Sequence, residues 1–331
     1  MKRVLIIATG GTIASTSDGA GLTPTATGRE LADKVPLLDE LAELDFVQPM
    51  NIDSTNMRPR DWLRIRDVIV EAYDRYDGFV VLHGTDTMAY TAAALSYLIQ
   101  NSEKPIVLTG SQQPMASPFT DAKLNLYQAV LYATDDASRD VSVVFSGKVI
   151  AGTRAHKQRT MSFNAFTSMN YPSLAYIRND RIVRAGAAPS ASAGSGLPCF
   201  YDSMDEHVIV LKLTPEFQPT IFELLKRDYD AIILETFGIG GIPDALRDAI
   251  FGWVESGRTL VVTTQVPEEG LDLGVYEVGR AFAENPGILK GDDMTTEALV
   301  AKTMWALGQS RDPQVVRELF YREINHDRMP R

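Results

Sequence analysis

Two threonines each stand just beyond an apolar run that is bounded by glycine. Residues 4–8 (VLIIA) lead into TGGT, which ends at Thr12, and residues 79–82 (FVVL) lead into HGTD, which holds Thr85. Uninterrupted β-branched runs are typical of strands buried in a parallel sheet, and such sheets bind ligands beyond the carboxyl ends of their strands. The neighbouring glycines leave backbone N–H groups able to face a ligand. The pattern predicts a nucleophile beside an oxyanion pocket.

Each of these polar side chains also has a structural interpretation. Thr12 could cap the turn that follows it, and Thr85, Asp86 or Thr87 could cap the apolar segment that comes next. Lys157, in the segment RAHK, could be a solvated residue of a basic turn. Spacing alone does not decide between capping and catalysis, so both interpretations stay open at this level.

Strand-like runs alternate with helical periodicity along the chain, which predicts an α/β fold built from βαβ units. The first set of expected strands is 4–8, 79–82, 106–108 and 141–145, with helices at 62–76, 88–99 and 122–133. These strands are expected to form one twisted sheet. A second set has strands at 208–211, 231–234 and 260–262, with helices at 216–227, 244–255 and 295–308.

The composition changes to Ala, Gly, Ser and Pro between about residues 185 and 203. Such a segment cannot bury enough apolar surface to fold independently, and it is interpreted as a linker. We therefore expect a larger N-terminal parallel-sheet domain over residues 1–185, a linker over residues 186–205, and a smaller C-terminal α/β domain over residues 206–331.

Composition excludes several classes of function. The formal net charge of -11 argues against a nucleic-acid surface, which needs clustered Lys and Arg. The single cysteine, Cys199, cannot form an intrachain disulfide. The first apolar run ends at Ala8, which is short for a signal peptide, and no run approaches the ~18 apolar residues of a membrane span. We expect a cytoplasmic protein with neither nucleic acid nor membrane as a partner.

Cofactor motifs are also missing from the sequence. His83 and the other three histidines show no metal-ligand spacing, and no metal is expected. The glycines at 238–241 lack the Gly-x-Gly-x-x-Gly spacing of dinucleotide sites, and no P-loop is present. Nucleotide binding, and with it a nicotinamide-dependent oxidoreductase, is disfavoured.

Taken together, the segments around these residues resemble the bacterial-type L-asparaginase family. ATGGTIA, which holds Thr12, and VLHGTDTM, which holds Thr85 and Asp86, match the two signature motifs of that family. Further matching segments are DSTNM (53–57), LTGSQ (108–112), RAHK (154–157), LGVYEVG (273–279) and GDDMT (291–295). The resemblance covers nearly the whole chain and is greatest to the cytosolic type I enzymes.

This resemblance implies hydrolysis of L-asparagine to L-aspartate and ammonia, with Thr12 as the nucleophile that forms an acyl-enzyme. Thr85, Asp86 and Lys157 match the second threonine, the acid and the lysine of the family, and the lysine eases removal of a proton from Thr85. Tyr276 stands where a tyrosine of type I relatives approaches the nucleophile. The implied reaction needs no cofactor.

The implied substrate contacts come from the same segments. Asp86 would pair with the ammonium of the substrate, and Ser54 and Thr55 would hold its α-carboxylate. Backbone groups near Gly11 and Thr85 would form the oxyanion pocket. The full set of substrate-binding candidates is Gly11, Ser54, Thr55, Gly84, Asp86 and Glu277.

The sequence departs from the family pattern at two places. Residues 21–24 (GLTP) lack the loop tyrosine that contacts the nucleophile in many members. Glu235 and Val266 stand where some type I enzymes carry the arginine and cysteine of an allosteric asparagine site. The resemblance therefore does not imply cooperative activation here.

Three questions stay open in the sequence. The first is the substrate range. A broader asparaginase-glutaminase is one alternative, because the one methylene that distinguishes glutamine from asparagine is worth only ~1–3 kcal/mol of discrimination. A D-asparagine amidase is another. A non-catalytic amino-acid sensor would need Asp86 and Ser54 but not the nucleophile, so the presence of Thr12 argues against it. The resemblance implies a homodimer or a homotetramer with sites near a subunit interface.

Overall fold

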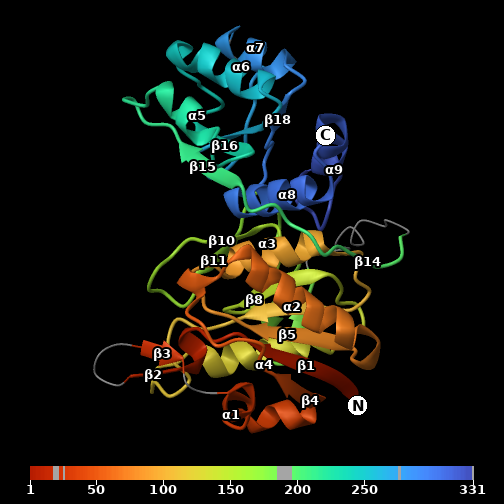
Figure 1. Ribbon diagram of the computed structural model, residues 1–331. Helices are drawn as coiled ribbons and strands as arrows, with labels where there is room; N and C mark the ends of the chain where they lie inside the picture. Colours follow the sequence, from red (N-terminus) through yellow and green to blue (C-terminus); the bar gives the residue numbers. More distant parts are fainter. Residues whose placement is uncertain (18–21, 25–26, 185–195, 275–276, 330–331) are drawn as a thin grey trace. The chain divides into compact units, whose positions relative to one another are not determined.

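The computed structural model describes residues 1–17, 22–24, 27–184, 196–274 and 277–329 of the chain (Figure 1). The chain divides into two compact units, which are described separately. Unit 1 comprises Met1–Asp202 with Ile324–His326, and unit 2 comprises Ser203–Glu323 with Asp327–Arg331. Among the described residues, no helix is both long and apolar enough to cross a lipid bilayer.

Unit 1 is built on an eight-stranded sheet with strand order β13-β12-β9-β8-β7-β5-β1-β4. Its strands are β1 (Lys2–Ala8), β4 (Ala42–Val47), β5 (Gly78–Leu82), β7 (Ile106–Thr109), β8 (Val141–Phe145), β9 (Lys148–Ala151), β12 (Ala175–Arg178) and β13 (Arg181–Val183). Strands β4, β1, β5, β7 and β8 are parallel, and β9, β12 and β13 extend the sheet in antiparallel pairs. The four predicted strands are thus confirmed as neighbours in one sheet.

The apolar runs form the inner strands because both faces of the sheet are covered. Helices α2 (Pro59–Ala72) and α3 (Met88–Leu98) lie on one face, and α1 (Gly28–Ala32) and α4 (Ala122–Ala133) lie on the other (Figure 1). Every residue of β5 is buried, and Val80 and Leu82 share a core cluster with Leu126 of α4. The helix predicted over 62–76 begins earlier, at a proline, and passes after Ala72 into a 3-10 turn over Tyr73–Arg75.

Several short elements of unit 1 have no clear sequence signal. They are β2 (Ser15–Ser17), β3 (Leu22–Pro24), β6 (Ile99–Gln100), β10 (Ala155–Lys157), β11 (Phe166–Ser168) and β14 (Cys199–Phe200). Strand β14 lies inside the segment predicted as a linker and pairs with β6. Strand β10 pairs with β11 and carries Lys157 at its last position.

Unit 2 has a parallel sheet with strand order β15-β16-β17-β18. The strands are β15 (Val208–Lys212), β16 (Ala231–Thr236), β17 (Thr259–Thr264) and β18 (Ile288–Lys290), and the helices are α5 (Thr220–Leu225), α6 (Arg247–Glu255), α7 (Glu277–Glu284), α8 (Thr296–Gln309) and α9 (Pro313–Tyr321). A second α/β unit, and with it the predicted α/β class, is confirmed. The helix predicted over 216–227 is shorter, because it begins only after Pro219.

Candidate active site

The carboxyl ends of three neighbouring strands of unit 1 bring the sequence candidates to one edge of the sheet. Strands β1 and β5 pair in parallel with Ala8 opposite Leu82. Just beyond them, the Thr9 N–H donates to the carbonyl of Leu82 at 3.0 Å, and the His83 N–H donates to the carbonyl of Thr109 at 2.8 Å. The segments that carry Thr12 and Thr85 therefore leave the sheet side by side.

Two glycines let these segments touch. Gly11 has a φ of +81°, and a β-carbon at this position would lie 2.4 Å from both N and Cα of Gly84. A β-carbon at Gly84 would lie 2.6 Å from Oγ of Ser54, so a third loop joins the contact. Only glycine fits at Gly11, because a side chain would be strained by the backbone and would overlap its neighbour. Thr12 and Thr85 each follow directly after one of the two touching glycines.

Lys157 connects the second threonine with the acid. Its Nζ donates to Oγ1 of Thr85 at 2.8 Å and to Oδ1 of Asp86 at 2.6 Å. The side chain of Lys157 is 17% exposed and that of Asp86 is 57% exposed. Lys157 is therefore a residue of β10 that reaches the loop after β5, and the solvated-turn interpretation is wrong. A short charge-assisted network lies beside the glycine contact.

The capping interpretation of the HGTDT segment also fails. Thr87 takes the N-cap position of α3, but its hydroxyl donates to the carbonyl of Ser54 at 2.7 Å. Asp86 accepts from Lys157, and the hydroxyl of Thr85 bonds to Oε1 of Gln112 at 3.1 Å. All three side chains tie loops together. Thr12 is half-buried and opens a 3-10 turn over Thr12–Ala14.

The binding candidates differ in what they can offer a ligand. Ser54 is only 2% exposed and lies against Gly84. Thr55 is exposed, and its hydroxyl donates to Oδ1 of Asp53 at 3.0 Å, so it must rotate before it can donate to a carboxylate. The N–H of Gly11 donates to the carbonyl of Ile52 at 3.1 Å. An oxyanion pocket at this turn would therefore draw on the N–H of the next residue, Thr12.

His83 supports the loop from inside the protein. It is completely buried, and burial lowers its pKa to about 4, so the ring is neutral at physiological pH. Its Nδ1 lies 2.7 Å from the carbonyl of Gly84, and its Nε2 lies 2.9 Å from Oγ1 of Thr91. Because a carbonyl only accepts, Nδ1 carries the proton and Nε2 accepts from Thr91. Both ring nitrogens are thus engaged in holding the Gly84 peptide.

Two of the candidate residues, Tyr276 and Glu277, have side chains that lie outside the described part of the structure. Tyr276 lies outside the described residues. Glu277 is the first residue of α7 in unit 2, and its side chain is likewise outside the description. Both remain predictions. Gln112, in contrast, is a contact of Thr85 that was not among the sequence candidates; its signal was its place in the LTGSQ segment after β7.

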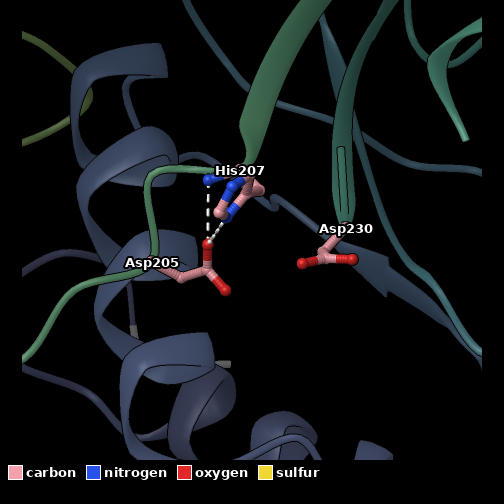
Figure 2. Close-up of side chains that lie close together, drawn as sticks. All are labelled: Asp205, His207 and Asp230. Carbon is pink, nitrogen blue, oxygen red and sulfur yellow. Dashed lines mark hydrogen bonds and ion pairs between the residues drawn. The ribbon is translucent and has the colours of Figure 1, made fainter. Parts of the chain in front are cut away.

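A second cluster of polar groups lies in unit 2 (Figure 2). Asp205, His207 and Asp230 place their ligand-type atoms within 4.8 Å of one another, because they stand at or before the starts of β15 and β16. Nδ1 of His207 is 2.8 Å from Oδ1 of Asp205. Arg311 forms an ion pair with each carboxylate, at 2.8 Å to Asp230. Since one guanidinium already pairs with both acids, we interpret the cluster as a structural ion-pair network.

Comparison with known proteins yields a consistent result. Residues 3–188 match the family described as "Asparaginase, N-terminal", and residues 207–320 match "Glutaminase/Asparaginase C-terminal domain". The chain is 38% identical to the L-asparaginase of Thermococcus kodakarensis over 97% of this chain and 98% of that protein. It is 32% identical to L-asparaginase 1 of Escherichia coli K12 over 99% and 98%. The solved structure of the thermostable T. kodakarensis L-asparaginase superposes with a TM-score of 0.92 at 36% identity, covering 99% of this chain and 100% of that one.

Proposed function

The chain belongs to the asparaginase family, and we propose that it hydrolyses L-asparagine to L-aspartate and ammonia through an acyl-enzyme on Thr12. One observation carries the proposal. The network of Thr85, Asp86 and Lys157 stands directly beside the contact of Gly11 with Gly84, at the edge of the sheet where the segment of Thr12 ends.

The proposed reaction needs a nucleophile and an acceptor for its proton. The hydroxyl of Thr12 attacks the side-chain amide carbon of asparagine, the C–N bond breaks, and the proton from the hydroxyl leaves with the nitrogen as ammonia. Water then cleaves the ester and restores Thr12. A neutral alcohol is a poor nucleophile, so it requires a positioned base. Thr85, which accepts from Lys157 at 2.8 Å, is the residue that could accept a hydrogen bond from the Thr12 hydroxyl and orient it while its proton passes to the leaving nitrogen.

Substrate recognition follows from the charges around the same contact. Asp86 binds Lys157 through Oδ1, and its other oxygen is suited to an ammonium group. Ser54 offers a buried hydroxyl beside Gly84 for the α-carboxylate. The N–H groups of Thr12 and Thr85 are the proposed donors to the oxyanion, where a single donor is typically worth ~10²–10³ in rate.

The experiment is ammonia release from L-asparagine, L-glutamine and D-asparagine, measured side by side with wild type and Thr12→Ala. Release from L-asparagine that disappears in a folded Thr12→Ala variant supports the proposal. Full release by that variant would refute Thr12 as the nucleophile. If wild type releases ammonia from none of the three amides, the amino-acid sensor becomes the better interpretation, and calorimetry with L-asparagine would follow.

A broader asparaginase-glutaminase is the second candidate. The description matched by residues 207–320 names glutaminases as well as asparaginases. Thr55 leaves a short side chain at the substrate loop, and an extra methylene costs only ~1–3 kcal/mol in discrimination. The ratio of kcat/KM for L-asparagine to that for L-glutamine decides between the two.

The resemblance to type I enzymes also supports proposals about assembly and location. We propose a cytoplasmic protein that forms a homodimer or a homotetramer and uses no metal or cofactor. Light scattering coupled to size-exclusion chromatography gives the oligomeric state directly. We expect the activity to survive extensive treatment with EDTA. If EDTA abolished the activity and a divalent metal restored it, the proposed chemistry would be contradicted.

A further inference from the structure

Gln112 contacts Thr85, but none of the roles proposed above uses it. It follows β7, and its backbone N–H is held by both carboxylate oxygens of Asp121, at 3.1 and 3.0 Å. Its side-chain Nε2 lies 3.0 Å from the carbonyl of Thr160 and 3.3 Å from that of Ser162. Its Oε1 lies 3.1 Å from Oγ1 of Thr85.

These contacts determine which way each group donates. Backbone carbonyls only accept hydrogen bonds, so the NH₂ group of Gln112 must face the 160–162 loop. Its oxygen, which only accepts, then faces Thr85. The ammonium of Lys157 only donates, and it occupies the other side of the Thr85 hydroxyl at 2.8 Å. The single proton of the Thr85 hydroxyl therefore points to Gln112.

We propose that Gln112 is a positioning residue that fixes the direction of the Thr85 hydroxyl. The inference rests on the proposed function and deepens it. With its proton held by Gln112, the hydroxyl turns one lone pair toward Lys157 and keeps the other in a fixed direction, where it can accept a hydrogen bond from the hydroxyl of Thr12 and orient that nucleophile. Lys157, Thr85 and Gln112 then form a chain in which each hydrogen bond polarises the next. Without Gln112 the hydroxyl can rotate, and an acceptor is no longer presented in a defined direction.

The alternative is that Gln112 matters only because it holds the 160–162 loop. Two variants separate these roles. Gln112→Met and Gln112→Glu both lose the NH₂ group that binds the carbonyls of Thr160 and Ser162. Only Gln112→Glu keeps an oxygen that can accept from Thr85. Gln113 is the matched control, because it is the adjacent residue with the same side chain and is exposed.

The experiment is steady-state hydrolysis of L-asparagine by wild type, Gln112→Met, Gln112→Glu, Gln113→Met and Gln113→Glu, together with thermal melts. In Gln112→Met we expect kcat to fall roughly tenfold to a hundredfold, as small misplacements of catalytic groups do, with KM and Tm nearly unchanged. Gln112→Glu should recover part of the lost kcat. The two Gln113 variants report the effect of side-chain loss and of added charge on the same loop, and both should behave as wild type.

The other outcomes overturn the inference. Normal kcat in Gln112→Met shows that the hydroxyl needs no such partner. Equal losses in Gln112→Met and Gln112→Glu, with KM or Tm changed as well, assign Gln112 to loop structure alone. Wild type without activity on any amide would instead refute the proposed function, and the inference would fall with it.

Discussion

At the scale of single residues, the candidate site depends on contacts that side chains make across large sequence separations. Lys157 reaches Thr85 from 72 positions away. Gly11 and Gly84 come close enough to exclude a β-carbon. Each of these two contacts depends on a single side chain or on its absence. Single substitutions at Lys157 and at Gly11 should therefore have large effects, on activity in the first case and on both stability and activity in the second.

Replacing Lys157 with methionine removes the charge and keeps most of the side-chain volume. We expect kcat/KM for L-asparagine to fall about 10²–10⁴-fold, the usual contribution of a positioned proton-transfer group. The Tm should change little, because the Asp86 partner is largely exposed. Steady-state kinetics and a thermal melt test this, with Lys123→Met on exposed α4 surface as the control. Nearly normal kinetics in Lys157→Met would show that Lys157 takes no part in the proposed reaction.

Replacing Gly11 with alanine tests the contact with Gly84. The added carbon would overlap that backbone, and the φ of +81° is unfavourable for alanine. We expect a loss of roughly 1–3 kcal/mol in unfolding free energy and a large loss of activity. In the control, Gly252→Ala, the new methyl meets nothing within 4 Å in the middle of α6, and stability should rise by about 0.5–1 kcal/mol. Urea unfolding of both variants measures these changes in the free energy of unfolding. A Gly11→Ala variant as stable and as active as wild type would contradict the close contact with Gly84.

At the scale of elements, the connection from β5 to α3 is held by a buried imidazole. His83 sits at the strand end and bonds both to the next peptide and to Thr91 within α3. Because the imidazole is neutral in the folded protein, protonation at low pH would disturb its hydrogen bonds to Gly84 and Thr91.

Stability should therefore fall as this connection is acidified. Burial lowers the pKa of His83 to about 4 in the folded protein, from the ordinary histidine value of 6.5. The unfolded chain takes up a proton below pH 6.5 while the folded protein does not, so stability is lost as pH falls from 6.5 toward 4. The full shift corresponds to about 3 kcal/mol. Urea unfolding at pH 7 and pH 4.5 should show a smaller acid loss in His83→Gln than in wild type. Equal pH dependence of the two proteins would contradict the assignment.

At the scale of the whole molecule, the chain forms two units, each with its own buried polar centre. In unit 2 the centre is an ion pair between Lys302 of α8 and Asp327, and both side chains are completely buried. Burial lowers the pKa of Lys302 to about 8. An ion pair without access to water is far more sensitive to loss of one partner than a pair on the surface.

Replacing Lys302 with methionine should selectively destabilise unit 2. Asp327 would keep a buried charge without its lysine, a change that typically costs about 3–5 kcal/mol. Hydrogen exchange should then accelerate in α8 and β15–β18 more than in β1, β5 and β7. The double variant with Asp327→Leu should recover part of the loss, because the buried carboxylate that lost its lysine is gone. Uniform acceleration over both units would show that the effect is not confined to unit 2.

The sequence was sufficient to predict the strands β1, β5, β7 and β8 and the helices α3 and α4, because apolar runs, helical spacing and turn residues are local signals. It missed β4, whose residues alternate poorly between buried and exposed, and the very short strand β18. Helix α9 did have a local signal, since Asp312 and Pro313 form a typical helix start.

For the candidate site, the sequence alone indicated that Thr12, Thr85 and Asp86 follow strands, and the family resemblance added Lys157 and Ser54. The tertiary structure was needed to show that Lys157 bonds to Thr85, that Gln112 bonds to the same hydroxyl, and that His207 bonds to Asp205 beside Arg311. These contacts had no local signal because strand order in the sheet, rather than any local pattern, brings residues far apart in the chain within hydrogen-bond distance.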